Sequence, residues 1–415
     1  MKHIFIIICF FFATGIFGQV EKKTVNKSFY FNPEFVLGVT AEANTGFPKR
    51  GLQTGLFLNF GWHNQSNEYE WVKQLNYPKT GISIGVTDYG NSEKLGQAFS
   101  VLPFVEFNLF KRWDLHTAIG VSYTNTQYHV INNPFNEAIT TNLNWSFKAL
   151  MYYDLFKTDV LNWKVGFGYN HSSNGHSRLP NQGLNSFLAG VSTTFKSKKN
   201  NTNKTLDTSK TPTTKQWYFS SRFDIGQNVL SEIFNDKKEV YSVAFSGGKI
   251  INKTFKFGAG FYYRFYEHYY DYIKNEEELI TTQYPDLTDK PFANASNFGV
   301  FVTSELLLSH IGFEFDIGFN IHKPFYKIDW KLNQGYSYIN GQGETVVILG
   351  ELDDYYKLKK TVSARLGLKY YVVNNDLAPK HNAFIGAHIN ANLGQADFTA
   401  LTLGYVYRFD MKNKP

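Results

Sequence analysis

The strongest constraint in this sequence is an alternation of apolar and polar residues with a period of two, which recurs in many segments of the chain. In one segment, Phe313, Phe315 and Ile317 are separated by Glu314 and Asp316. Successive side chains of a β-strand point to opposite faces, so such a segment predicts a strand with one apolar face. The clearest segments are residues 81–87, 143–151, 313–319 and 362–370.

Two all-β architectures fit this pattern. In a soluble sandwich the polar face meets solvent, whereas in an outer-membrane barrel the apolar face meets lipid and the polar face lines the lumen. The segments are about the ten residues that a tilted membrane strand needs, with aromatic residues near their ends. The composition of 18% aromatic residues, 33 glycines and only 19% charged residues also suits strands. We therefore expect an antiparallel transmembrane β-barrel.

The N-terminus predicts export. Lys2 and His3 form a short basic start, an apolar run extends from Ile4 to Phe17, and small Gly18 follows. This is the pattern of a secretory signal peptide, residues 1–18, with cleavage after Gly18. A membrane-spanning helix is the alternative, but the run is short for one. Together with the strands, the signal predicts a multi-pass barrel in the cell outer membrane.

Connection lengths indicate how the strands are arranged. We count about eight strands from residue 35 to 195 and about eight more from 217 to 409, an even number in each half. Short turns alternate with long polar loops, as expected for periplasmic turns and external loops. The connection His63–Lys79 is an exception, because it is long on the short side. The long loops are Thr124–Thr140, Glu267–Ala295 and His322–Tyr356.

A tract rich in Lys, Asn and Thr divides the chain. Residues 197–215 lack apolar periodicity and predict a flexible linker. The predicted domains are a barrel at 30–196 and a barrel-like repeat at 216–410. Two tandem eight-stranded barrels and one barrel of about sixteen strands both fit, and the length of the linker favours the tandem arrangement.

One strand carries a candidate for chemistry at its external end. The outward series of residues 160–173 ends in His171 and Ser173, and the outward series of the next strand extends to Asn185. An antiparallel neighbour would place Asn185 beside His171. A serine, a histidine base and an orienting amide form an acyl-transfer site that needs neither metal nor cofactor. Asn174, or backbone N–H groups in the turn through Gly175, could bind the oxyanion.

The same segment carries a family resemblance. Residues 171–175 read His-Ser-Ser-Asn-Gly and residues 180–183 read Pro-Asn-Gln-Gly. They resemble the His-x-Ser-Asn and Pro-Asn-x-Gly motifs of the PagL-type lipid A deacylases, also called acyloxyacyl hydrolases. The loop 133–139 is similar to one in relatives of that family, and the resemblance covers roughly residues 30–196.

The resemblance implies an eight-stranded outer-membrane barrel whose partner is lipid A, or lipopolysaccharide, in the outer leaflet. It implies hydrolysis of the ester-linked 3-hydroxyacyl chain at the lipid A 3-position by Ser173 and His171. The family members carry a glutamate as the third catalytic residue, where this chain has Asn185. Glu137, in the preceding external loop, is an alternative source of the missing charge.

Other interpretations remain open at this point. The chain could be a non-enzymatic barrel, acting as a pore, an adhesin or a lipid-binding scaffold with a vestigial site. The second half repeats a histidine, His388, but the alternation points it toward the lumen and Asn390 replaces the serine. We therefore expect a non-catalytic second half. The net charge of +7 is spread along the chain, and no nucleic-acid-binding motif accompanies it.

Overall fold

The computed structural model describes residues 28–64, 68–158, 160–195, 213–341, 343–348 and 353–410. The predicted signal peptide, residues 1–18, lies outside these ranges, as do residues 197–212 of the predicted linker.

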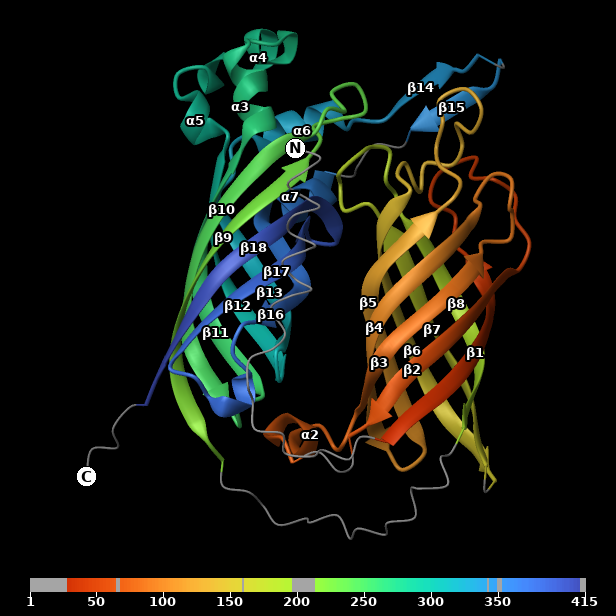
Figure 1. The fold of residues 1–415 in the computed structure, drawn as a ribbon. Coiled ribbons are helices and arrows are strands. Elements are labelled where there is room, and N and C mark those ends of the chain that lie inside the picture. The colour runs from red at the N-terminus through yellow and green to blue at the C-terminus, as the bar shows by residue number, and fades with distance from the viewer. Residues whose placement is uncertain are drawn as a thin grey trace, which may run out of the picture.

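The described chain forms two closed antiparallel barrels of eight strands each, standing side by side (Figure 1). The first barrel, residues 28–195, consists of β1 (Ser28–Thr40), β2 (Gln53–His63), β3 (Lys79–Asp88), β4 (Gln97–Phe110), β5 (Trp113–Thr124), β6 (Leu143–Lys157), β7 (Leu161–Ser173) and β8 (Leu184–Phe195). The second barrel, residues 215–409, consists of β9 (Lys215–Asn228), β10 (Lys238–Ile251), β11 (Phe255–Tyr266), β12 (Ser296–Leu308), β13 (Ile311–His322), β16 (Val362–Tyr371), β17 (His381–Asn392) and β18 (Gln395–Phe409).

Each barrel closes by pairing its own first and last strands. β1 pairs with β8 in the first barrel, and β18 pairs with β9 in the second. The prediction of tandem eight-stranded barrels is thus confirmed, and the alternative of one larger barrel is wrong.

The period-two pattern sets which residues face outward. On β8, Phe187 is 66% exposed, whereas its neighbour Leu188 is 5% exposed and packs inside the barrel. The same alternation continues along the strand to outward Val191 and inward Ser192. Since the apolar series faces out, the outer surface suits a lipid environment, as in outer-membrane barrels.

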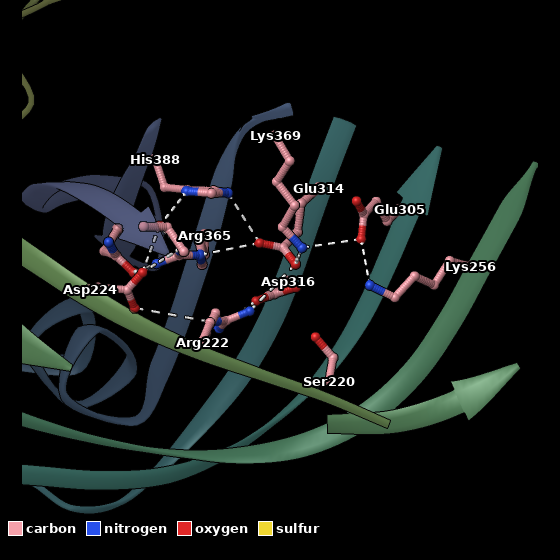
Figure 2. Close-up of polar contacts among 12 residues, drawn as sticks. Ser220, Arg222, Asp224, Lys256, Glu305, Glu314, Asp316, Arg365, Lys369 and His388 are labelled. Carbon is pink, nitrogen blue, oxygen red and sulfur yellow. Dashed lines mark hydrogen bonds and ion pairs between the residues drawn. The ribbon is translucent and has the colours of Figure 1, made fainter. Parts of the chain in front are cut away.

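Buried charges fill the lumen of the second barrel (Figure 2). Arg365 lies between Asp224, at 2.8 Å, and Glu314, at 3.3 Å. Lys256 and Lys369 both contact Glu305, at 2.8 Å and 3.1 Å. These buried charges thus have partners of opposite sign, which offsets the cost of their desolvation.

Buried ion pairs also occupy the lumen of the first barrel. Lys148 pairs with Glu34, and Lys164 pairs with Glu106 at 2.7 Å and with Asp114. Side chains therefore occupy both interiors, as expected for barrels of this size.

The long external loops are more ordered than their polar composition predicts. The segment Glu267–Ala295, predicted as a loop, folds largely as short helices, because Tyr269, Tyr272 and Ile273 share one helical face and pack with Phe325 in a hydrophobic cluster. None of the described helices is long and apolar enough to cross a membrane. The loop elements of the second barrel are α3 (Glu267–Lys274), α4 (Glu278–Gln283), η1 (Pro285–Leu287), α5 (Pro291–Asn294), α6 (Tyr326–Leu332), β14 (Tyr336–Ile339), β15 (Thr345–Ile348) and α7 (Asp353–Thr361), with η2 (Asn375–Leu377) in a short turn.

The exceptional connection His63–Lys79 has a role in joining the barrels. It contains the short helix α2 (Glu70–Gln74), which lies at the end of the barrels opposite the long loops (Figure 1). Trp71 donates from Nε1 to Ser309 Oγ of the second barrel at 3.0 Å, and it packs in one cluster with Leu308. The extra length of this connection therefore supplies a docking element.

Candidate active site

The register of β7 and β8 brings the three predicted site residues together. His171 lies opposite Asn185 in the ladder, and Ser173 is two residues further along the same face. His171 Nδ1 is 2.8 Å from Asn185 Oδ1, and His171 Nε2 is 3.0 Å from Ser173 Oγ. The three side chains form one continuous hydrogen-bonded chain.

The donors and acceptors in these hydrogen bonds can be assigned. An amide oxygen can only accept a hydrogen bond, so Asn185 Oδ1 selects the imidazole tautomer that carries its proton on Nδ1. Nε2 of His171 is then the acceptor for the Ser173 hydroxyl. This is the arrangement required of a histidine that removes a proton from a serine nucleophile.

Tyr169 is a fourth member that the sequence analysis did not identify. Its hydroxyl donates to Asn185 Oδ1, the same atom that accepts from His171. Two donors at one oxygen fix which end of the amide faces the histidine. The signal was present in the sequence, since Tyr169 lies two residues before His171 in the outward series and diagonally across from Asn185 on the next strand.

A glycine allows the loop to approach the histidine. Gly183 has φ +77°, and a Cβ atom at this position would lie 2.8 Å from His171 Cε1. Both the backbone conformation and the contact exclude a larger residue. The glycine of the Pro-Asn-x-Gly motif thus permits the close packing of the loop against the imidazole.

The turn that follows Ser173, residues 174–183, is organised by Asn174, and we call it the active-site turn. The backbone N–H of Asn174 donates to Asn181 Oδ1 at 2.9 Å, and its side-chain amide donates to the carbonyl of Arg178 at 2.7 Å. Ser177 N–H in turn donates to Asn174 Oδ1 at 3.1 Å. Asn174 therefore supports the turn in this conformation, and the predicted role of its side chain at the oxyanion is not seen. Gly175 follows in the left-handed region, with φ +66°.

Glu137 lies near the site but does not orient the histidine. The carbonyl of Glu137 accepts from Gln182 N–H at 3.0 Å, which fastens its loop to the active-site turn. The residue is 2% exposed and lines the same cavity as His171 and Ser173. Burial, together with the nearby carboxylate of Glu232, raises the pKa of Glu137 to about 7. The orienting position that the sequence offered to Glu137 as an alternative belongs to Asn185.

The site opens into a cavity of about 630 Å³ shared by the two barrels. His171 and Ser173 line one side, and Tyr326, Ile389 and Asp397 of the second barrel line the other. Ser173 is only 5% exposed. Its outward orientation agrees with the alternation, and the second barrel forms part of the wall of the cavity that it lines.

His176, the other histidine of the active-site turn, contacts the second barrel. Its Nε2 lies 3.1 Å from the carbonyl oxygen of Val229. Burial lowers the pKa of His176 below the usual histidine value. Its ring thus links the active-site turn to the second barrel.

The site is thus a serine, a histidine and an amide joined by hydrogen bonds on the outside of an eight-stranded barrel. Residues 53–194 match the family model described as "Lipid A 3-O-deacylase (PagL)". The resemblance predicted from the motifs is therefore confirmed for the first barrel. This match and the barrel fold support an outer-membrane β-barrel.

Three solved structures are similar to this chain at low sequence identity. The "Crystal structure of the outer membrane enzyme PagL" is 18% identical, with 39% of this chain and 97% of that chain covered, at a TM-score of 0.29. A triple mutant of the Rhodopseudomonas blastica porin is 8% identical, with coverage of 92% and 100% and a TM-score of 0.17. OprB of Pseudomonas putida at high pH is also 8% identical, with coverage of 92% and 94% and a TM-score of 0.17. No curated protein matches the chain.

Proposed function

We propose that this chain is an outer-membrane serine esterase that removes an ester-linked 3-hydroxyacyl chain from lipid A or a related glycolipid. The hydrogen-bonded chain from Ser173 through His171 to Asn185 carries this proposal. The family match to residues 53–194 supplies the substrate class. Export through a cleaved signal peptide, residues 1–18, is part of the same proposal.

In the acylation step, Ser173 Oγ attacks the ester carbonyl while His171 Nε2 takes its proton. The tetrahedral intermediate collapses, the C–O bond to the sugar breaks, and the imidazolium returns the proton to the sugar oxygen. The products are a glycolipid with a free hydroxyl and an acyl group esterified to Ser173.

In the second step, water hydrolyses the acyl-enzyme. His171 Nε2 takes a proton from the water, whose oxygen attacks the acyl carbonyl. The proton then passes to Ser173 Oγ as the acyl bond breaks, which releases the 3-hydroxy fatty acid.

The oxyanion needs hydrogen-bond donors next to Ser173. The donors of Asn174 are directed into the active-site turn, so among the two predicted residues the backbone N–H of Gly175 is the better candidate. Removal of one such donor costs roughly 100- to 1000-fold in kcat in serine hydrolases.

The amide of Asn185, in place of a carboxylate, should affect the rate of ester hydrolysis. It orients His171 and fixes its tautomer, but it stabilises the imidazolium less than a carboxylate does. The Tyr169 hydroxyl also donates a hydrogen bond to Asn185 Oδ1, so two donors share this oxygen. We therefore propose an enzyme that turns over slowly for its class.

The alternative of a pore receives no support from the barrel interiors, where ion pairs occupy the lumen of each barrel. Mass spectrometry of lipid A tests the enzyme directly. Cells that express the wild-type chain should lose one 3-hydroxyacyl chain from lipid A, and cells that express Ser173→Ala at the same level should not. Identical spectra would leave only a non-catalytic scaffold.

A further inference from the structure

The two barrels touch at both ends. At the external end, Thr399 Oγ1 lies 3.2 Å from Trp145 Nε1 and donates to the carbonyl of Gly175 at 3.3 Å. Asn235 makes a pair of bonds to the backbone of Leu179, at 2.7 Å and 3.0 Å. At the opposite end, α2 docks through Trp71. These contacts set the spacing of the two outward faces.

Between these contacts lies an apolar groove of about 950 Å³. Its walls are outward-facing side chains of both barrels. They include Trp62 and Ile82 from the first barrel and Ile225, Ile385, Leu401 and Leu403 from the second.

The groove leads to the candidate active site along one strand. On β17, Ile385 and Ala387 line the groove, and the next outward residues, Ile389 and Ala391, line the cavity that contains Ser173. Ala387 and Ile389 are about 7 Å apart along the strand. One continuous wall of the second barrel therefore runs from the nucleophile into the apolar groove.

We propose that the groove binds the acyl chain of the lipid substrate, with the scissile ester at Ser173 and the second barrel as one wall of the binding site. This inference rests on the esterase function proposed above. An acyl chain is favoured over a protein segment because its polar end and its apolar tail fit the two connected cavities in order. The second barrel is then part of the enzyme, although the proposed nucleophile lies in the first barrel.

The first experiment fills the groove. Ala387→Trp places a large side chain on its wall, and Val302→Trp places the same side chain on an outward position of β12 that lies outside the groove. Purified full-length variants are assayed on lipid A in mixed micelles and on a water-soluble short-chain ester such as p-nitrophenyl butyrate. The short ester shows that the active site is intact.

We expect Ala387→Trp to lower kcat/KM for lipid A on the order of tenfold, mainly through KM, because each methylene displaced from an apolar site weakens binding. Activity on the short ester should stay unchanged, and Val302→Trp should behave as wild type in both assays. Equal losses in the two Trp variants, or no loss in either, would contradict the proposal that the groove binds the acyl chain. A wild-type protein inactive on both esters would refute the proposed function instead.

The second experiment does not depend on turnover. The Ser173→Ala variant is mixed with lipid A that carries a photoactivatable diazirine near the end of an acyl chain, and the labelled peptides are identified after irradiation. Labels on β17 or β18 between residues 385 and 403 are expected. Labels spread evenly over outward positions of both barrels would show that the groove holds lipid without preference, which contradicts the proposal.

Discussion

The seventh strand of each barrel carries a histidine near its end, and the two histidines face opposite sides of their sheets. His171 on β7 points outward, beside Ser173 and Asn185. His388 on β17 points into the lumen, where Nδ1 lies 2.8 Å from Thr402 Oγ1 and Nε2 lies 3.1 Å from Glu314. Figure 2 shows His388 beside Arg365 in the buried ion network.

Each histidine thus has a hydroxyl within hydrogen-bond reach, and His388 even has the carboxylate that His171 lacks. The two histidines differ in whether they can be reached from a cavity. His388 is fully buried, whereas His171 and Ser173 line a cavity. A shift of one residue along a strand moves a side chain to the other face. The comparison teaches that the face on which the residues lie, more than their type, separates a candidate catalytic site from a structural one.

The largest expected effect separates the two histidines directly. His171→Ala should lower esterase activity on lipid A by about 1000-fold or more, since it removes the base that contacts Ser173. His388→Ala should leave kcat within about twofold while it lowers the stability of the second barrel by about 1–3 kcal/mol, because it breaks buried hydrogen bonds. Activity assays and thermal unfolding in detergent measure the two effects. A larger loss of kcat in His388→Ala than in His171→Ala would contradict the assignment of His171 as the catalytic base.

The next prediction concerns Asn185. Asn185→Leu should lower kcat by about 100-fold or more, because the imidazole loses the group that sets its tautomer. Asn185→Glu should keep the tautomer and better stabilise the imidazolium, so kcat should equal or exceed that of the wild type. Circular dichroism checks that both variants form barrels. A Glu variant as poor as the Leu variant would exclude Asn185 from the catalytic chain.

A smaller effect tests the support that the second barrel gives to the active-site turn. Asn235→Ala removes both bonds to Leu179, and we expect kcat to fall roughly 3- to 10-fold as the turn loses its fixed position. Asn294→Ala is the matched control, because Asn294 bonds to Leu287 within the same barrel. Unchanged kcat in Asn235→Ala would show that the first barrel holds the turn without help.

The smallest effect is on pH dependence. The pKa of Glu137, raised to about 7, exceeds its ordinary value of 4.5, so the protonated form stabilises the fold. This stability is complete below pH 4.5 and is lost as the pH rises through about 7. Glu137→Gln should therefore be more stable than wild type at pH 8, on the order of 1 kcal/mol, and similar to it at pH 4. Thermal unfolding at both pH values measures this, with exposed Glu93→Gln as a control that should show no such difference.

Much of the fold and the centre of the site were predictable because β-structure has a fixed local period. The alternation assigned faces, and the antiparallel pairing of consecutive strands then placed His171, Ser173 and Asn185 together. The same reasoning placed His388 in the lumen, where the structure has it.

What the sequence could not predict depends on contacts between distant parts of the chain. The docking of Trp71 on Ser309 and the shared cavity at Ser173 arise where the two barrels meet, and no local pattern encodes their spacing. The role of Asn174 was open in the sequence for a different reason. Its donors could serve an oxyanion or the turn, and only the geometry of the turn shows that they bond to Asn181 and Arg178.

Covalent labelling tests the central claim most directly. A lipophilic fluorophosphonate reacts with a serine only when a base activates it, and peptide mass spectrometry then locates the adduct. We predict one adduct, on Ser173, in the wild-type protein and its loss in His171→Ala, with full labelling retained in His388→Ala. Labelling of Ser173 that is equally strong without His171, or an adduct found only in the second barrel, would contradict the account.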